Sequence, residues 1–194
     1  MTKITRRTFA ALALGAALFA APAFAQDGKP HLILTLEDGV VDIELLPEIA
    51  PLHVERVVTL TQEGLYDGVV FHRVIDGFMA QTGDVRNGKA DSPNYNLQMA
   101  GTGGSDLPNV QAEFNAESFV RGVVGAARSQ DPNSFNSQFF ITTDDASFLD
   151  GQYTVFGKVV SGMDAVDALE KGPQERNGAV ENPDRIVKAE IEYK

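Results

Sequence analysis

Apolar and polar residues alternate over several short segments of the chain, as they do in half-buried β-strands. The clearest case is the segment 41–45, Val-Asp-Ile-Glu-Leu. The apolar run 32–36 precedes it, and the turn signal Glu37-Asp38-Gly39 between the two predicts a β-hairpin. Strand-like runs predict further strands over 69–74, 79–81, 120–126, 138–142 and 153–160, and alternation predicts a last strand over 187–193.

Two helices are predicted between these strands. Pro51 suits the first turn of a helix, and Gly64 suits the position just after its end. A shorter helix is predicted over 163–169, and the polar stretch 83–111 is expected to be an extended loop. Many short strands with two helices predict a mainly-β fold, a closed eight-stranded antiparallel β-barrel capped by two α-helices.

The first 25 residues differ from the rest and predict a secretory signal peptide. Basic residues at positions 3, 6 and 7 precede the apolar run 10–21, and Ala23-Phe24-Ala25 resembles a cleavage site. Thr5-Arg6-Arg7-Thr8-Phe9 resembles a twin-arginine export motif, with an ordinary Sec signal and a buried N-terminal helix as alternatives. We therefore expect a signal peptide at 1–25, a single domain at 26–194, and a periplasmic or secreted product.

The charge of the predicted mature chain limits its partners. Three of the 16 basic residues lie in the first 25 positions, so 13 basic and all 27 acidic residues remain, a net charge of −14. An acidic surface repels nucleic acid and anionic lipid, so we expect neither nucleic-acid binding nor membrane binding after signal removal. The chain has no Cys, which excludes disulfides and thiolate chemistry. A monomer is the default expectation.

Three sequence clusters carry candidate chemistry. They are FHRVIDGFMAQTGD at 71–84, SQFFI at 137–141 and FLDGQYTVFGKV at 148–159. In this order and spacing they resemble the cyclophilins, and the resemblance covers about residues 33–193. It implies a barrel fold and isomerisation of the peptide bond before proline in polypeptide substrates, with no metal and no cofactor.

The resemblance also implies roles for individual residues. The catalytic residues would be Arg73, Gln81 and His72, with Arg73 as the donor that meets the proline nitrogen when the amide twists. The substrate-binding residues would be Phe78, Met79, Gln138, Phe140, Phe148, Leu149, Tyr153, Ala127, Arg128, Ser129 and Gly101. The segment Ala127-Arg128-Ser129 stands where the family commonly has Ala-Asn-Ala, which puts substrate preference in doubt.

Several alternatives stay open at this point. His72 suits substrate contact and structural hydrogen bonding about equally, and alternation assigns Phe71 and Phe139 to the core. We expect His31 and His53 to lie on the surface. A peptide-binding scaffold without isomerase activity could use the same barrel and would not depend on Arg73. Residue types alone do not exclude a Ser-His-Asp hydrolase, because the geometry of the three residues defines such a site. The sequence shows no nucleophile elbow, however.

Overall fold

The structure of the protein is a computed structural model that describes residues 28–93 and 95–194. The predicted signal peptide at 1–25 lies outside the described residues. In the described part, no helix combines the length and the apolar character needed to cross a bilayer.

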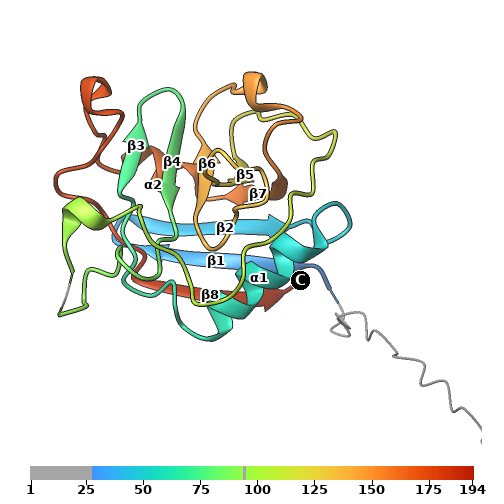
Figure 1. The fold of residues 1–194 in the computed structure, drawn as a ribbon, viewed down its shortest axis with the longest axis horizontal. Coiled ribbons are helices and arrows are strands. Elements are labelled where there is room, and N and C mark those ends of the chain that lie inside the picture. The colour runs from blue at the N-terminus through green and yellow to red at the C-terminus, as the bar shows by residue number, and fades with distance from the viewer. Residues whose placement is uncertain (1–27, 94) are drawn as a thin grey trace, which may run out of the picture.

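Eight antiparallel strands form one curled sheet (Figure 1). Their order in the sheet is β3-β4-β6-β5-β7-β2-β1-β8. The predicted hairpin is confirmed, since β1 and β2 pair up to Leu36 and Gly39 on either side of the turn. The predicted mainly-β fold is confirmed as well. The strands are β1 (Pro30–Leu36), β2 (Gly39–Leu45), β3 (Arg73–Ile75), β4 (Met79–Thr82), β5 (Val123–Ala126), β6 (Phe139–Thr142), β7 (Val155–Ser161) and β8 (Lys188–Tyr193).

The two ends of the sheet, β3 and β8, come together where residues 70–73 meet residues 179–185, which precede β8. Val70 bridges Arg185, and Arg73 bridges Ala179. These are single bridges and not a ladder, so the sheet forms a curled half-barrel, and the closed barrel predicted from the sequence is not confirmed. The predicted strand over 69–74 is also shorter in the structure, because only Arg73–Ile75 pair continuously with β4.

Both predicted helices are present, and both pack on the sheet. Helix α1 (Pro51–Gln62) contacts β8 and β7, and α2 (Met163–Ala168) contacts β2. The Glu113 carboxylate accepts hydrogen bonds from the backbone N–H groups of Leu52 and His53, so it caps the free donors at the start of α1. Three short 3₁₀ helices lie in the loops: η1 (Leu97–Met99), η2 (Ser147–Leu149) and η3 (Gln174–Arg176).

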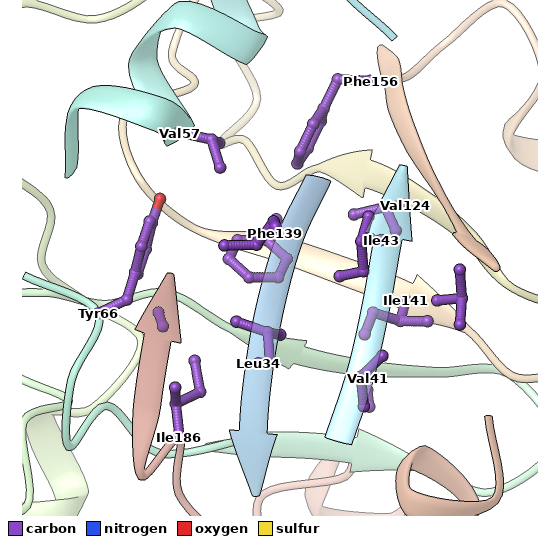
Figure 2. Close-up of a cluster of buried hydrophobic side chains, with 14 of the residues drawn as sticks. Leu34, Val41, Ile43, Val57, Tyr66, Val124, Phe139, Ile141, Phe156 and Ile186 are labelled. Atoms are coloured by element: carbon purple, nitrogen blue, oxygen red, sulfur yellow. The ribbon is translucent and has the colours of Figure 1, made fainter. Parts of the chain in front are cut away.

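Aromatic and aliphatic side chains fill the interior of the curled sheet (Figure 2). Phe139 lies at the centre of this core and meets the rings of Tyr66 and Phe156 edge-on, at centroid distances of 5.6 and 6.1 Å. Phe71 is also buried, so both residues that alternation assigned to the core are confirmed there. Burial of this apolar surface is the main force that holds the sheet in its curled shape.

The expectation that His31 and His53 lie on the surface is wrong. His53 is 1% exposed, stacks on Phe135 at 4.5 Å, and its Nδ1 lies 2.7 Å from the Glu113 carboxylate. His31 is buried, and its Nδ1 lies 2.6 Å from the Asp42 carboxylate. A buried imidazole is tolerated when its ring nitrogens have hydrogen-bond partners, and a sequence pattern does not reveal such distant partners.

Candidate active site

Strands β3, β4 and β6 bring several predicted site residues onto one face. Arg73 pairs with Gln81 between β3 and β4, and Gln81 pairs with Phe140 between β4 and β6. Met79 shares this face because alternate residues of a strand point the same way. The side chains line a cavity of about 320 Å³, which we call the small cavity. It is lined by Arg73, Phe78, Met79, Gln81, Ala127, Arg128, Phe140, Phe148, Leu149 and Tyr153.

The inner part of the small cavity is apolar and deeply buried. Met79, Phe140 and Leu149 are 1%, 5% and 9% exposed. Phe140 stacks on Phe119 with a centroid distance of 5.6 Å, and Tyr153 meets its edge at 5.9 Å. Locked aromatic side chains of this kind give the cavity a fixed shape and suit a compact apolar ring.

Two aromatic residues form the outer rim of the small cavity. Phe148 is 64% exposed, and its ring lies 5.4 Å from that of Phe78. An apolar ring that enters the cavity would pass this exposed aromatic surface and remove it from water, which favours binding.

Arg73 is the only basic residue from β3 and β4 that lines the small cavity, and its guanidinium is held from two sides. Nε donates to the backbone O of Asn177 at 2.9 Å, and Nη2 donates to its side-chain O at 3.0 Å. Nη1 donates to Gln81 at 3.2 Å and lies 3.7 Å from the Met79 sulfur. Burial lowers the pKa of Arg73, with Tyr153 acting in the opposite direction, but a guanidinium stays protonated in proteins.

A chain of hydrogen bonds leads from Arg73 to a glycine loop. Gln81 accepts from Arg73 and donates to the side-chain O of Gln138 at 3.1 Å. Gln138 in turn donates to the backbone O of Gly101 at 3.0 Å and of Gly103 at 2.8 Å. Gln81 and Gln138 therefore have partners within the protein, and each is fixed in orientation by its neighbour.

The glycine loop forms one wall of a second cavity of about 520 Å³, which we call the large cavity. Gly101, Ala127, Arg128 and Ser129, all predicted to bind substrate, line it. Gln81, Ala127 and Arg128 line both cavities, so the two are neighbours and an extended peptide can cross from one to the other.

A buried carboxylate holds the glycine loop in place. Asp84 is fully buried, and one of its oxygens accepts from the backbone N–H groups of Arg86 and Asn87. Its other oxygen accepts from Gly101 and Gly103, each at 2.8 Å. Four backbone donors satisfy the charge, so the carboxylate ties two loops to the end of β4.

His72 lines neither cavity, in contrast to the other predicted catalytic residues. It is buried beneath Gly101, where a Cβ would lie only 2.6 Å from the imidazole Cδ2. Burial lowers the pKa of His72 to about 4, although the charge of Asp84 opposes the shift. The imidazole therefore faces the loop as a neutral ring, and its direct part in catalysis stays a prediction.

The sequence interpretation missed Asn177 as a site residue and gave no role to Asp84. Asn177 ends η3 with a left-handed backbone, φ 54°, and precedes Gly178. An Asn-Gly pair is a recognisable turn signal, but nothing in it indicates contact with an arginine on another element.

Comparisons with known proteins agree with this geometry. The family model described as cyclophilin type peptidyl-prolyl cis-trans isomerase/CLD matches residues 31–191. A protein from Brucella suis biovar 1, named "Probable peptidyl-prolyl cis-trans isomerase", is 58% identical over 184 residues, which cover 95% of this chain and 92% of the relative. "Peptidyl-prolyl cis-trans isomerase A" from Dickeya dadantii is 35% identical, with 92% of each chain covered.

Solved structures show the same likeness. The cyclophilin AquaCyp293 from Hirschia baltica superposes with a TM-score of 0.68 at 30% identity, over 82% of this chain and 73% of that one. A Cryptosporidium parvum cyclophilin type isomerase, crystallised in the presence of the dipeptide Ala-Pro, superposes with a TM-score of 0.71 at 25% identity, over 84% and 99%.

Proposed function

Because the chain belongs to the family of cyclophilin-type peptidyl-prolyl cis-trans isomerases, we propose that Arg73 performs the electrostatic step of X–Pro rotation beside the small cavity. The enzyme class follows from the family. Membership of the family does not by itself establish the mechanism or the biological setting in this protein, so both are proposals. The contacts of the site support the proposed mechanism.

The mechanism starts from the resistance of an amide to rotation. Twisting the bond removes its resonance and costs about 18–20 kcal/mol. In the twisted state the proline nitrogen regains a lone pair, which neither planar isomer has. A hydrogen-bond donor aimed at that nitrogen stabilises the transition state more than the ground states, and this difference accelerates the reaction.

Arg73 has the donor that this step needs. A guanidinium carries five N–H groups. The four hydrogen bonds to Asn177, Gln81 and the Met79 sulfur leave one N–H, on Nη2, without a partner in the described structure. The partners fix the plane of the group, so little reorganisation is needed when the substrate twists.

The small cavity supplies the grip on the proline ring. Its buried apolar floor of Met79, Phe140 and Leu149 suits a five-membered ring that has no N–H to satisfy. The Cryptosporidium parvum relative was crystallised in the presence of Ala-Pro, a dipeptide that contains proline. We propose that proline-containing polypeptides bind here with the ring on Phe140 and the backbone along Ala127 and Gln138.

The test measures how fast the full chain and its variants isomerise a tetrapeptide that contains proline. NMR exchange spectroscopy gives the rate. Arg73→Ala should lower kcat/KM by a factor that corresponds to about 2–4 kcal/mol, as for loss of one oxyanion-type donor. Arg185→Ala is a matched control, because that guanidinium pairs with Asp91 outside both cavities. Unchanged activity in Arg73→Ala would refute the role of the arginine.

The same variants separate an enzyme from a peptide-binding scaffold. A scaffold would use the exposed aromatic rim and would suppress aggregation of an unfolded client as well in Arg73→Ala as in the wild type. We propose isomerisation as the primary activity, because a passive binder does not need a guanidinium held by Asn177 and Gln81.

We further propose that the protein is exported and assists the folding of exported proteins as a monomer in the periplasm. The signal-like residues 1–25 support the export, and the net charge of −11 argues against nucleic-acid binding. Mass spectrometry of the N-terminus in a periplasmic fraction tests the export. A product that still begins at Met1 in the cytosol would refute it.

A further inference from the structure

The residues that line the two cavities differ in charge from the chain as a whole. The chain carries a net charge of −11, yet among the described residues three arginines and no Asp or Glu line the small and large cavities. One of these arginines, Arg86, is paired with Asp106 at 2.5 Å. The other two, Arg73 and Arg128, have no carboxylate within 4 Å among residues 28–93 and 95–194.

Arg128 keeps two N–H groups that it can offer to a ligand. Its Nε and Nη2 donate to the backbone O of Gln152 at 3.3 and 2.9 Å, and Nη1 donates to the backbone O of Ser129 at 2.9 Å. Since a guanidinium has five N–H groups, one remains on each terminal nitrogen. Two such donors match the two oxygens of a carboxylate. Arg73 keeps only one N–H and cannot offer this pair.

The guanidinium of Arg128 is also held in a fixed plane. Its central carbon lies 4.3 Å from the centroid of the Tyr153 ring, and the three backbone hydrogen bonds restrain its rotation. A group that is already ordered loses little conformational freedom when it binds, so its hydrogen bonds contribute more to affinity. These contacts distinguish Arg128 from a freely moving surface arginine.

The position of Arg128 determines which part of a substrate it can reach. It lines both the small cavity, where the proline ring is proposed to bind, and the large cavity beside it. A side chain bound by Arg128 therefore belongs to a residue close to the proline in the peptide sequence.

We propose that Arg128 is a specificity determinant that selects polypeptide segments with an acidic side chain close to the isomerised proline. The inference rests on the proposed function and names the substrate class of the same site. An Asp or Glu side chain at that place forms a bidentate ion pair with the two free N–H groups. A Lys side chain meets an uncompensated positive charge.

The test uses peptides that contain one proline. In each peptide Glu, Gln or Lys stands at one of four positions, the two before the proline or the two after it. Isomerisation is measured by NMR exchange spectroscopy, which needs no coupled protease. At one position the wild type should show a kcat/KM for Glu about three- to ten-fold above that for Gln, the range of a partly exposed charge-assisted pair. The ratio should shrink when ionic strength rises from about 0.05 to about 0.5 M.

The decisive number is the Glu/Gln ratio, which is kcat/KM for the Glu peptide divided by kcat/KM for the Gln peptide with the same variant. A general loss of activity cancels in this ratio. Arg128→Gln should bring the ratio to about one, and Arg128→Lys should keep part of it. Arg185→Gln is the matched control and should keep the wild-type ratio, because Arg185 pairs with Asp91 and lines neither cavity.

A wild-type ratio near one at every position, or a ratio that survives Arg128→Gln, overturns the proposal. If Arg128→Gln fails to fold, the wild-type preference for Glu over Lys and its salt dependence decide the matter. Absence of isomerisation for every peptide would instead refute the proposed function, so the two failures are distinguishable.

Discussion

Asn177 accepts two hydrogen bonds from the Arg73 guanidinium, although 104 residues separate the two in the sequence. The backbone O receives Nε, and the side-chain O receives Nη2. Asn177 follows η3, which lies in the segment that returns beside β3 (Figure 1). We infer that Asn177 is a positioning residue, because it acts on the substrate only through the orientation of Arg73.

Replacement of Asn177 should reduce turnover more than peptide binding. Asn177→Gly removes the side-chain acceptor without strain at φ 54°, and we expect kcat to fall roughly ten-fold or more as the guanidinium loses its alignment. Asn177→Asp keeps an acceptor but adds a charge that neutralises the field of Arg73, so its kcat should fall at least as far. NMR titration with an inert peptide gives the affinity. Wild-type kcat in Asn177→Asp would contradict the electrostatic role of Arg73.

Gly125 should be intolerant of any side chain because it lies against the floor of the small cavity. A Cβ at this position would be 2.5 Å from Cζ of Phe140 and 2.6 Å from Cε1 of Phe119. Gly125→Ala should therefore destabilise the protein by about 1–3 kcal/mol and displace the Phe140 ring. Urea unfolding and kcat/KM measure the two effects. Adding Phe119→Leu makes room for the new side chain, so the double variant should regain part of the lost stability. If no stability is regained, the clash lies elsewhere.

Asp84→Asn should loosen the glycine loop. The carboxylate serves four backbone N–H groups, whereas an amide has a single oxygen and presents its own N–H groups to the rest. We expect a loss of about 2–3 kcal/mol in unfolding free energy, the cost of leaving buried donors unsatisfied. Hydrogen exchange at Gly101 and Gly103 should accelerate. If exchange there stays at the wild-type rate, Asp84 does not hold the loop.

The protein should lose stability in mild acid because of His72. Its pKa is lowered from 6.5 to about 4 by burial, so the unfolded chain takes up a proton at a higher pH than the folded protein does. The stabilising effect of the neutral ring is complete above pH 6.5 and is lost as the pH falls from 6.5 towards 4.

Denaturant unfolding of the wild type and of His72→Gln at pH 7 and pH 4 checks this prediction. The wild type should lose about 2–3 kcal/mol more than the variant over this range, since a tenfold change in a proton-binding constant corresponds to about 1.4 kcal/mol. The comparison with the variant is needed because burial also lowers the pKa of His53. Equal losses in both proteins would show that the ring of His72 is not desolvated.

Alternation in the sequence predicted β2 and β8, whose positions alternate between more and less buried, whereas β5 and β6 are buried throughout and stand in the sequence as apolar runs. The sequence pattern overestimated the length of β3 at its start. Residues 69–72 are buried, but they pair only through isolated bridges and loop contacts. The same limit explains His53. Its burial depends on Glu113, which lies 60 residues away and cannot be inferred from neighbouring positions.

The sequence predicted those residues of the candidate site that lie in the three clusters shared with the family. Arg73, Met79, Gln81 and Phe140 line one cavity, as the resemblance implies. The supporting residues were harder to predict. Asp84 stands in the first cluster, but its four partners come from two loops, and Asn177 lies in a turn with no apparent chemistry of its own. Such contacts depend on the path of the chain in space and not on residue type.

The hold of Asn177 on Arg73 has a consequence for the order in which the protein matures during synthesis. A ribosome makes residue 73 well before residue 177, and until the later segment emerges the guanidinium has no acceptor on that side. A nascent chain that already contains all three sequence clusters therefore still lacks the aligned guanidinium that we propose as the catalytic group. If Arg73 acts as we propose, full isomerase activity is expected only once the segment around residue 177 has folded beside β3.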